Sequence, residues 1–338
     1  MRCGSRTSSC GRSPTPSCGS RPPTGRTSGR STSIAPSRSS SGGRAASVEC
    51  DVAVAVAVVG LVGGAGRPAV LKRLLSTAAL LPAFLLIVVK APAWLFNALV
   101  VLASARASWE LTRMLEQAGR PVLRRLGVLA GVALTASFGV SRLPEPLLLP
   151  GLVLTLAVGA ILAAPIWQSG APGVESTANT LLAVLYIGWL LGYGILLHRT
   201  SPHGAELVLF LVGVTWVGET AAYLVGSTLG RHPLAPVVSP RKTVEGSVAQ
   251  MIASVATAVA LGAWLLPDCR LPVAMAAGGL LGLVGQVGDL AESVIKRTVG
   301  LKDTGALIPG HGGVLDRIDS LLFNLPAFYY FSRLTGCA

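Results

Sequence analysis

Long apolar stretches restrict the possible fold of this chain more than any other feature. Several runs between residues 74 and 290 reach or exceed the ~20 residues with which a helix crosses a bilayer. Hydrophobic residues make up 51% of the chain, and the mean hydropathy is +0.63. The same segment holds too few polar residues to cover a water-soluble core of its size. We therefore predict an all-α, polytopic integral membrane protein.

The apolar runs predict about nine transmembrane helices, at roughly 73–89, 93–114, 125–141, 146–167, 177–198, 205–229, 246–266, 271–298 and 315–334. Prolines mostly fall at the ends of these spans, as expected of residues that break helices. With a cytoplasmic N-terminus, the connections place thirteen Lys and Arg residues on the cytoplasmic side and five on the other. By the positive-inside rule we expect this orientation, in the inner (plasma) membrane of a bacterium.

The first 66 residues differ from the membrane domain that we predict for 67–338. Residues 1–47 are mostly Ser, Arg, Gly, Thr and Pro, with eight Arg and no acidic residue. Such a segment cannot bury enough surface to offset its chain entropy, so we predict disorder for 1–66. We interpret it as an upstream start-codon artefact; a transit peptide is the alternative.

Composition also argues against two classes of site. The net charge of +13 comes largely from the tail, because residues from Pro68 onward hold 19 basic and 13 acidic residues. That mild excess suits anionic lipid headgroups, and no folded basic face is available for nucleic acid. The six cysteines form no CxxC and show no metal-like spacing with the four histidines. We therefore predict neither a zinc site nor a disulfide framework.

Charged residues are concentrated near the C-terminus. Nine charged side chains and one histidine lie between Asp289 and Asp319, in a chain that is only 13% charged. Asp289, Glu292, Ser293 and Lys296 follow i, i+3, i+4 and i+7 spacing, so they share one face of a helix. Asp316 and Asp319 share a face at the start of the last span. Because ionisable groups in a membrane are costly, we predict that these two faces form a functional site.

The residue types point to phosphate chemistry. Paired carboxylates suit Mg²⁺, which typically binds one or two carboxylates together with substrate phosphates. The glycines of Pro309–Gly313 would let backbone N–H groups approach an anion closely. Four basic side chains could neutralise phosphate charge: Lys296, Arg297, Lys302 and Arg317. The alternative is a set of interfacial ion pairs that only stabilise helix ends.

A second polar patch, Ser239–Gly246, follows the sixth predicted span. It contains Lys242-Thr243 but lacks the glycine pattern of a P-loop, so it is not a Walker motif. Glu219 adds a carboxylate within the preceding span. The chain has 23 Arg and five Lys, yet three of the lysines, Lys242, Lys296 and Lys302, lie in these two patches. This bias indicates positions where a compact ammonium group is needed.

The segment from Ser293 to Asp319, with the pattern Ser-x-x-Lys-Arg-x-x-x-x-Lys-Asp-x-Gly-x-x-Ile-Pro-x-His-Gly-Gly-x-x-Asp-Arg-Ile-Asp, resembles the signature of the phosphatidate cytidylyltransferase (CDP-diacylglycerol synthase) family. The upstream segments Glu219–Gly226, Leu234–Pro236 and Ser239–Gly246 resemble it as well. The likeness runs from about Leu71 to the C-terminus. One departure is Glu219, where the family usually has Asp.

The resemblance implies an integral membrane enzyme that condenses CTP with phosphatidic acid to give CDP-diacylglycerol and pyrophosphate. It implies Mg²⁺, with a monovalent cation such as K⁺ as a possible companion. Expected partners are CTP, phosphatidic acid, membrane lipids and a second copy of the chain in a homodimer. Within the superfamily, an isoprenoid lipid phosphate or alcohol is the alternative acceptor. A transporter or channel would not need a metal–phosphate constellation on one face.

The resemblance and the residue chemistry together give the candidate roles. The expected catalytic residues are Asp289, Lys296, Asp316 and Arg317, and the expected metal ligands are Asp289, Asp316 and Asp319. The expected substrate-binding residues are Ser239, Lys242, Thr243, Ser293, Arg297, Lys302, His311, Gly312 and Gly313. Four acidic residues have no assigned role: Glu219, Glu245, Glu292 and Asp303.

Overall fold

The computed structural model describes residues 83–140, 145–167, 173–200, 202–300 and 313–337. All of them belong to one compact unit, Val62–Ala338. The predicted disordered tail, residues 1–66, lies outside the described residues. The first predicted span, 73–89, is described only from residue 83, and residues 83–89 are helical.

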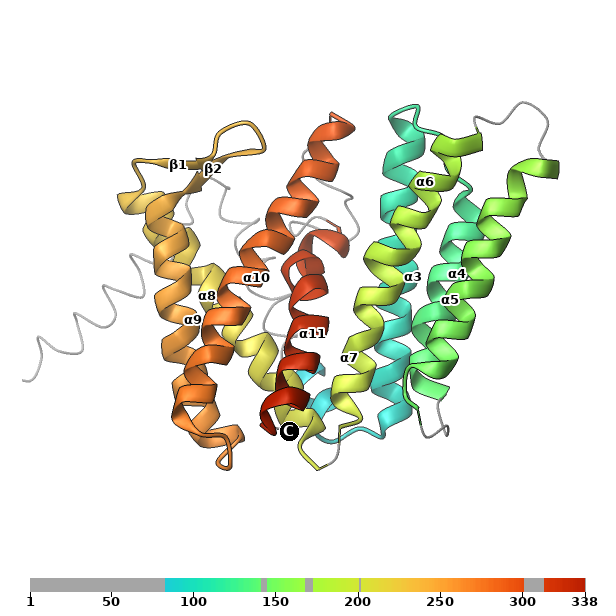
Figure 1. Ribbon diagram of the computed structural model, residues 1–338. Helices are drawn as coiled ribbons and strands as arrows, with labels where there is room; N and C mark the ends of the chain where they lie inside the picture. Colours follow the sequence, from blue (N-terminus) through green and yellow to red (C-terminus); the bar gives the residue numbers. More distant parts are fainter. Residues whose placement is uncertain (1–82, 141–144, 168–172, 201, 301–312, 338) are drawn as a thin grey trace, which may run out of the picture. The chain divides into compact units, whose positions relative to one another are not determined.

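Helices make up nearly all of the described chain (Figure 1). They are α3 (Ala93–Gln117), α4 (Arg124–Val140), α5 (Leu148–Ala163), η1 (Ala164–Trp167), α6 (Gly173–Ala183), η2 (Val184–Trp189), α7 (Leu190–His198), α8 (Gly204–Leu229), α9 (Val244–Leu265), α10 (Leu271–Thr298) and α11 (Leu315–Thr335). Each predicted span from 93–114 onward coincides with one of these helices or with a continuous run of them. The all-α prediction is confirmed.

Five helical segments of the described chain are long and apolar enough to cross a membrane: Leu148–Trp167, Gly173–His198, Gly204–Leu229, Val244–Leu265 and Leu271–Thr298. These helices also carry large apolar side chains that are exposed, such as Leu152 and Ile252, as expected of residues that face lipid. The protein is therefore an integral membrane protein. The number nine stays a prediction, because α3, α4 and α11 are shorter or more polar than these five.

Close helix packing positions the C-terminal part of the chain. Helices α8, α9, α10 and α11 lie against one another in sequence order, with further contact between α10 and α8 and between α11 and α7. Gly278 shows how close the packing is, since a Cβ there would lie 2.7 Å from the Cβ of Ala258. Phe210 of α8 and Phe328 of α11 are buried and stacked, with ring centroids 5.2 Å apart. Packing of this density holds side chains at the helix ends in fixed positions.

A short antiparallel hairpin joins α8 to α9. Strands β1 (Pro233–Ala235) and β2 (Ser239–Thr243) pair with Pro233 opposite Thr243 and Ala235 opposite Ser239. The sequence analysis did not predict strands here, because two prolines and a run of basic residues carry no β pattern. The hairpin lies at one end of the helices, and the C-terminus of α11 lies at the other (Figure 1).

The prediction about the cysteines is wrong for one pair. Cys269, between α9 and α10, is disulfide-bonded to Cys337, which follows α11. The two residues are 68 positions apart, and their spacing gives no sign of a bond. They meet because the α9–α10 connection and the end of α11 lie at the same end of the packed helices. The disulfide is therefore at the end opposite the hairpin (Figure 1).

Candidate active site

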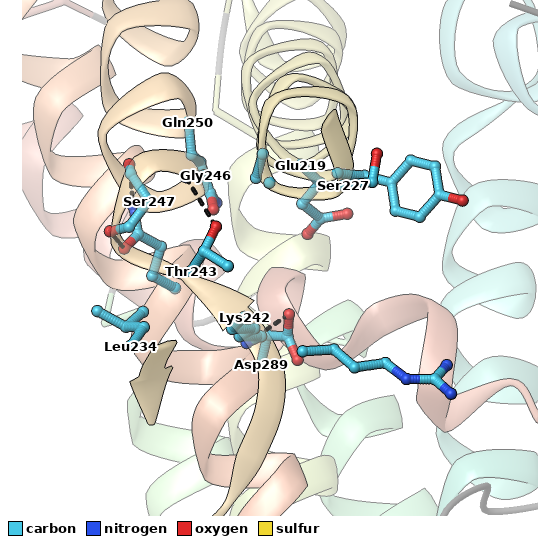
Figure 2. Close-up of a pocket in the computed structure, with 14 residues that line it drawn as sticks. Glu219, Ser227, Leu234, Lys242, Thr243, Gly246, Ser247, Gln250 and Asp289 are labelled. Carbon is cyan, nitrogen blue, oxygen red and sulfur yellow. Dashed lines mark hydrogen bonds and ion pairs between the residues drawn. The ribbon is translucent and has the colours of Figure 1, made fainter. Parts of the chain in front are cut away.

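The first link in the site joins the hairpin to α10. The Lys242 Nζ atom, at the end of β2, lies 2.6 Å from the Oδ2 atom of Asp289. Both side chains are half-buried, so the pair is within reach of solvent and of a ligand (Figure 2). The sequence analysis assigned both residues to the site but did not pair them. Their contact brings the second polar patch onto the carboxylate face of α10.

The second link joins α10 to the start of α11. Lys296 Nζ donates to Glu292 one turn earlier in α10 and lies 3.1 Å from Asp316 Oδ1 on α11. The other oxygen of Asp316, Oδ2, accepts a hydrogen bond of 2.9 Å from the backbone N–H of Gly313. Glu292 itself is fully buried. The two predicted carboxylate faces therefore meet, with Lys296 between them.

Gly288 allows α10 and α11 to approach each other at this point. A Cβ at residue 288 would lie 3.0 Å from the backbone oxygen of Asp319 and 3.2 Å from the Cα of Ser320. Asp319 Oδ1 accepts a hydrogen bond from the N–H of Ser320, and its charge interacts with that of Asp289 across the helix contact. The carboxylates of Asp289 and Asp319 thus face one region from two helices.

A cavity of about 490 Å³ opens beside the first link, the Lys242–Asp289 pair. Its lining comes from four elements: α8 with Glu219, Tyr223 and Ser227, the hairpin with Leu234, Arg241, Lys242 and Thr243, α9 with Gly246, Ser247 and Gln250, and α10 with Gln286 and Asp289. Figure 2 shows the Glu219 carboxylate directed from α8 toward the side on which Lys242 and Asp289 lie. Glu219, an unassigned acidic residue in the sequence analysis, therefore belongs to the site.

Three polar lining residues on α9 and α10 were missed by the sequence analysis. Gln250 is 7% exposed, and the Ser247 hydroxyl donates to the Gln286 side chain, whose amide donates back to the Ser247 carbonyl at 3.1 Å. The signal was present in the sequence, since each is a polar residue within a predicted apolar span. A single hydroxyl or amide in such a span is common enough that it did not stand out.

The Cytidylyltransferase family matches residues 71–335, more than half of the chain. The chain belongs to the cytidylyltransferase family. It is 44% identical over 154 residues to the Escherichia coli (strain K12) protein YnbB, which is described as uncharacterized; this covers 46% of the chain and 50% of that protein.

Two other relatives in the family carry an enzyme name. The chain is 40% identical over 149 residues to the phosphatidate cytidylyltransferase of Staphylococcus saprophyticus and 38% identical over 149 residues to that of Staphylococcus aureus (strain COL). Each match covers 44% of this chain and 56% of the relative. The chain thus spans about half the length of the curated relatives it matches.

Two residues expected to bind substrate, Thr243 and Arg297, and the unassigned Glu245 also stabilise the structure around the site. Thr243 caps α9 by accepting a hydrogen bond of 3.2 Å from the N–H of Gly246. Glu245 accepts hydrogen bonds from the backbone N–H groups of Arg231 and His232 and pairs with the His232 ring. Arg297 Nε donates to the carbonyl of Val238, in the hairpin turn. Together these contacts fix the hairpin that carries Lys242.

The remaining candidates fall into two groups. Ser239 begins β2, Ser293 lies on α10 one turn before Lys296, and Arg317 is exposed in the first turn of α11. Four others, Lys302, Asp303, His311 and Gly312, lie outside the described residues. The predictions for these four therefore stay predictions.

The carboxylates of the site are suitable ligands for Mg²⁺. Five carboxylates interact at this end of α8, α10 and α11, namely Glu219, Asp289, Glu292, Asp316 and Asp319, and the ion pairs set Lys242 and Lys296 against them. No three metal-ligand side chains of the described residues approach closely enough for a protein-only site. Mg²⁺ usually takes one or two carboxylates, with waters and substrate phosphates completing its octahedron. The residues fit an ion bound jointly with a phosphate substrate.

Proposed function

We propose that the protein is a phosphatidate cytidylyltransferase, which condenses CTP with phosphatidic acid to give CDP-diacylglycerol and pyrophosphate. Membership of the cytidylyltransferase family, relatives named phosphatidate cytidylyltransferase and the signature from Ser293 to Asp319 support this proposal. The single observation that carries it is structural. Two lysine–aspartate pairs connect the hairpin, α10 and α11: Lys242 with Asp289, which lines the cavity, and Lys296 with Asp316, two turns further along α10.

The two lysines have the chemistry that the reaction requires. Both substrates are polyanions, so the site must neutralise their charge before a phosphate oxygen can attack the α-phosphorus of CTP. An ammonium group held 2.6–3.1 Å from a carboxylate is already positioned and partly desolvated. When phosphates enter, Lys242 and Lys296 can donate to them without a large rearrangement. Positioning and electrostatic stabilisation of this kind supply most of the catalysis in such transfers.

The proposed reaction needs no dedicated general base. The phosphate monoester of phosphatidic acid has a second pKa of about 6, so at neutral pH it is largely a dianion and can attack directly. The new bond joins its oxygen to the α-phosphorus, and the bond to the β-phosphate bridging oxygen breaks. Pyrophosphate leaves with the electron pair. The chain therefore has to align the two anions in line and shield their charge.

Asp289, Asp316 and Asp319 would hold Mg²⁺, which when bound would neutralise the triphosphate and the departing pyrophosphate. A monovalent cation such as K⁺ could occupy the same acidic region. The five carboxylates outnumber the two lysines paired with them, and neighbouring like charges destabilise one another, which supports a need for bound cations. We also place this end of the helices at the cytoplasmic face of a bacterial inner membrane. The positive-inside distribution of Lys and Arg supports that orientation.

An acceptor panel tests the proposal. Purified protein in detergent micelles would receive CTP, Mg²⁺ and one lipid at a time: phosphatidic acid, an isoprenoid phosphate, an isoprenoid alcohol or diacylglycerol. We expect CDP-diacylglycerol, identified by mass spectrometry, with phosphatidic acid as the preferred acceptor. Preferential turnover of the isoprenoid phosphate or alcohol would replace the proposal by the alternative acceptor class. Absence of a lipid product with every acceptor would reject cytidylyl transfer to lipids.

A further inference from the structure

Helix α11, which carries Asp316 and Asp319, lacks an N-cap of its own. The residue at the cap position is Val314, whose side chain makes no capping hydrogen bond and whose backbone is helical (φ −67°, ψ −40°). The first N–H groups of a helix have no intrahelical partner and need one from elsewhere. The missing partner comes from another helix. The N–H of Leu315 donates a hydrogen bond of 3.0 Å to Glu110 Oε2, 205 residues away on α3.

Glu110 is an unusual residue to find at this place. It is 2% exposed and lies within one of the predicted transmembrane spans, where an ionised carboxylate is costly unless it is paired. Two partners offset the cost. Arg106, one turn earlier on α3, brings its Nε to 3.1 Å from Glu110 Oε1, and the N-terminus of α11 favours negative charge at Oε2. Oε2 therefore accepts a hydrogen bond, whereas Oε1 has the charge of Arg106 close by without the geometry of a hydrogen bond.

The contact sits directly beside the proposed active site. Leu315 immediately precedes Asp316, whose two oxygens are held by Lys296 and by the N–H of Gly313. Three contacts between described residues thus help to fix the start of α11: Glu110 holds the backbone, and Lys296 and Gly313 orient the carboxylate. Of the three, only the Glu110 contact comes from the N-terminal part of the chain. Loss of the Glu110 contact would free the start of α11 without removing any of the three expected metal ligands, Asp289, Asp316 and Asp319.

We propose that Glu110 is a positioning residue of the site: its carboxylate caps α11 from α3 and so holds Asp316 and Asp319 in register with Asp289. This inference about catalysis rests on the proposed function, whereas the capping itself does not. A purely space-filling role for residue 110 would be met equally well by a leucine. A capping role requires an acceptor oxygen at the same position.

Two substitutions separate these roles. Glu110→Gln keeps an acceptor oxygen of the same reach, and Glu110→Leu keeps the approximate size but removes the acceptor. The matched control is Glu116→Leu, on the same helix, where the native carboxylate pairs with Arg124 2.6 Å away and not with α11. If Glu110→Leu does not accumulate in the membrane, Glu110→Asp replaces it, because the shorter carboxylate should cap poorly.

The first measurement is hydrogen–deuterium exchange of the peptide that contains Leu315–Ser320, which needs no activity. Loss of the cap should speed exchange of the first-turn amides about tenfold or more in Glu110→Leu, because opening of the helix start becomes easier. Exchange in Glu110→Gln and Glu116→Leu should stay within about threefold of the native rate. Native exchange rates in Glu110→Leu would overturn the capping role.

The second measurement is turnover. We expect kcat to fall about 10–100-fold in Glu110→Leu, with a change of less than about threefold in the KM for CTP and recovery in Glu110→Gln. Faster exchange with unchanged kcat would overturn the link to catalysis and leave a structural cap. If the native protein transfers no cytidylyl group to any lipid, the proposed function fails, and the exchange measurement still decides whether Glu110 holds α11.

Discussion

Substitution of Gly288 by alanine should disturb the site by moving two helices apart while leaving every carboxylate in place. The new Cβ would lie 3.0 Å from the backbone oxygen of Asp319, 3.2 Å from the Cα of Ser320 and 3.3 Å from the Cβ of Phe323. Ordinary contacts of a Cβ begin at 3.4 Å. Two of these three neighbours are backbone atoms, which cannot rotate away. Helix α11 must therefore shift by a few tenths of an ångström relative to α10.

The expected size of the effect follows from that shift. Overpacking of this kind costs about 1–3 kcal/mol, of which the better helix propensity of alanine returns about 1 kcal/mol. The protein should therefore stay folded, with a thermal midpoint a few degrees lower at most. A misplacement of about 1 Å can cost a hundredfold in rate, so a shift of a few tenths should lower kcat about 3–30-fold.

The assay is turnover of CTP with phosphatidic acid, measured beside thermal unfolding in the same detergent. Gly279→Ala is the matched control, because it lies on the same helix and its Cβ would meet no heavy atom within 4 Å. The control should keep native kcat and gain slightly in stability. Native kcat in Gly288→Ala, or an equal loss in both variants, would refute the claim that the α10–α11 distance sets the geometry of the carboxylates.

The other predictions concern the charged pairs and the disulfide. Asp289→Asn and Asp316→Asn should each abolish turnover in folded, membrane-inserted protein, as EDTA should in the native protein; near-native activity at saturating Mg²⁺ would contradict the metal assignment. Lys242→Ala and Lys296→Ala should lower kcat/KM roughly 10–1000-fold. Arg at either position should rescue only partly, because a guanidinium fork differs in geometry from an ammonium group. Unchanged kinetics in both variants would show that these lysines bind neither substrate. In intact cells, a membrane-impermeant maleimide should label the cysteines at the end opposite the hairpin only after reduction, since disulfides persist in oxidising compartments; labelling without a reductant would contradict the disulfide.

The sequence predicted the helices and half of the site for the same reason, namely periodicity. Asp289, Glu292 and Lys296 follow the helical repeat, so their common face could be predicted without any tertiary information. The junction of that face with Asp316 was also predictable, because the two helices follow each other in the chain and each carries a pair of carboxylates. Glu219 was noticed for a different reason, its charge within an apolar span, and its role stayed unassigned.

Contacts between segments that are distant in the chain could not be predicted from the sequence. Nothing in the sequence pairs Lys242 with Asp289, and the bond between Cys269 and Cys337 depends on which helix ends meet. Glu110 carried the same signal as Glu219, a lone carboxylate in an apolar span, but its partner is a backbone N–H with no sequence signature. Such contacts follow from helix packing, which composition and periodicity leave undetermined.

The most direct test of the account follows the two parts of CTP separately. Purified protein would receive phosphatidic acid, Mg²⁺ and CTP labelled at the α-phosphate. The account predicts that label enters the lipid fraction in the same molar amount as pyrophosphate is released, and that both vanish without phosphatidic acid or in Asp316→Asn. Label that stays in the aqueous fraction, or pyrophosphate released without a lipid acceptor, would contradict cytidylyl transfer at this site.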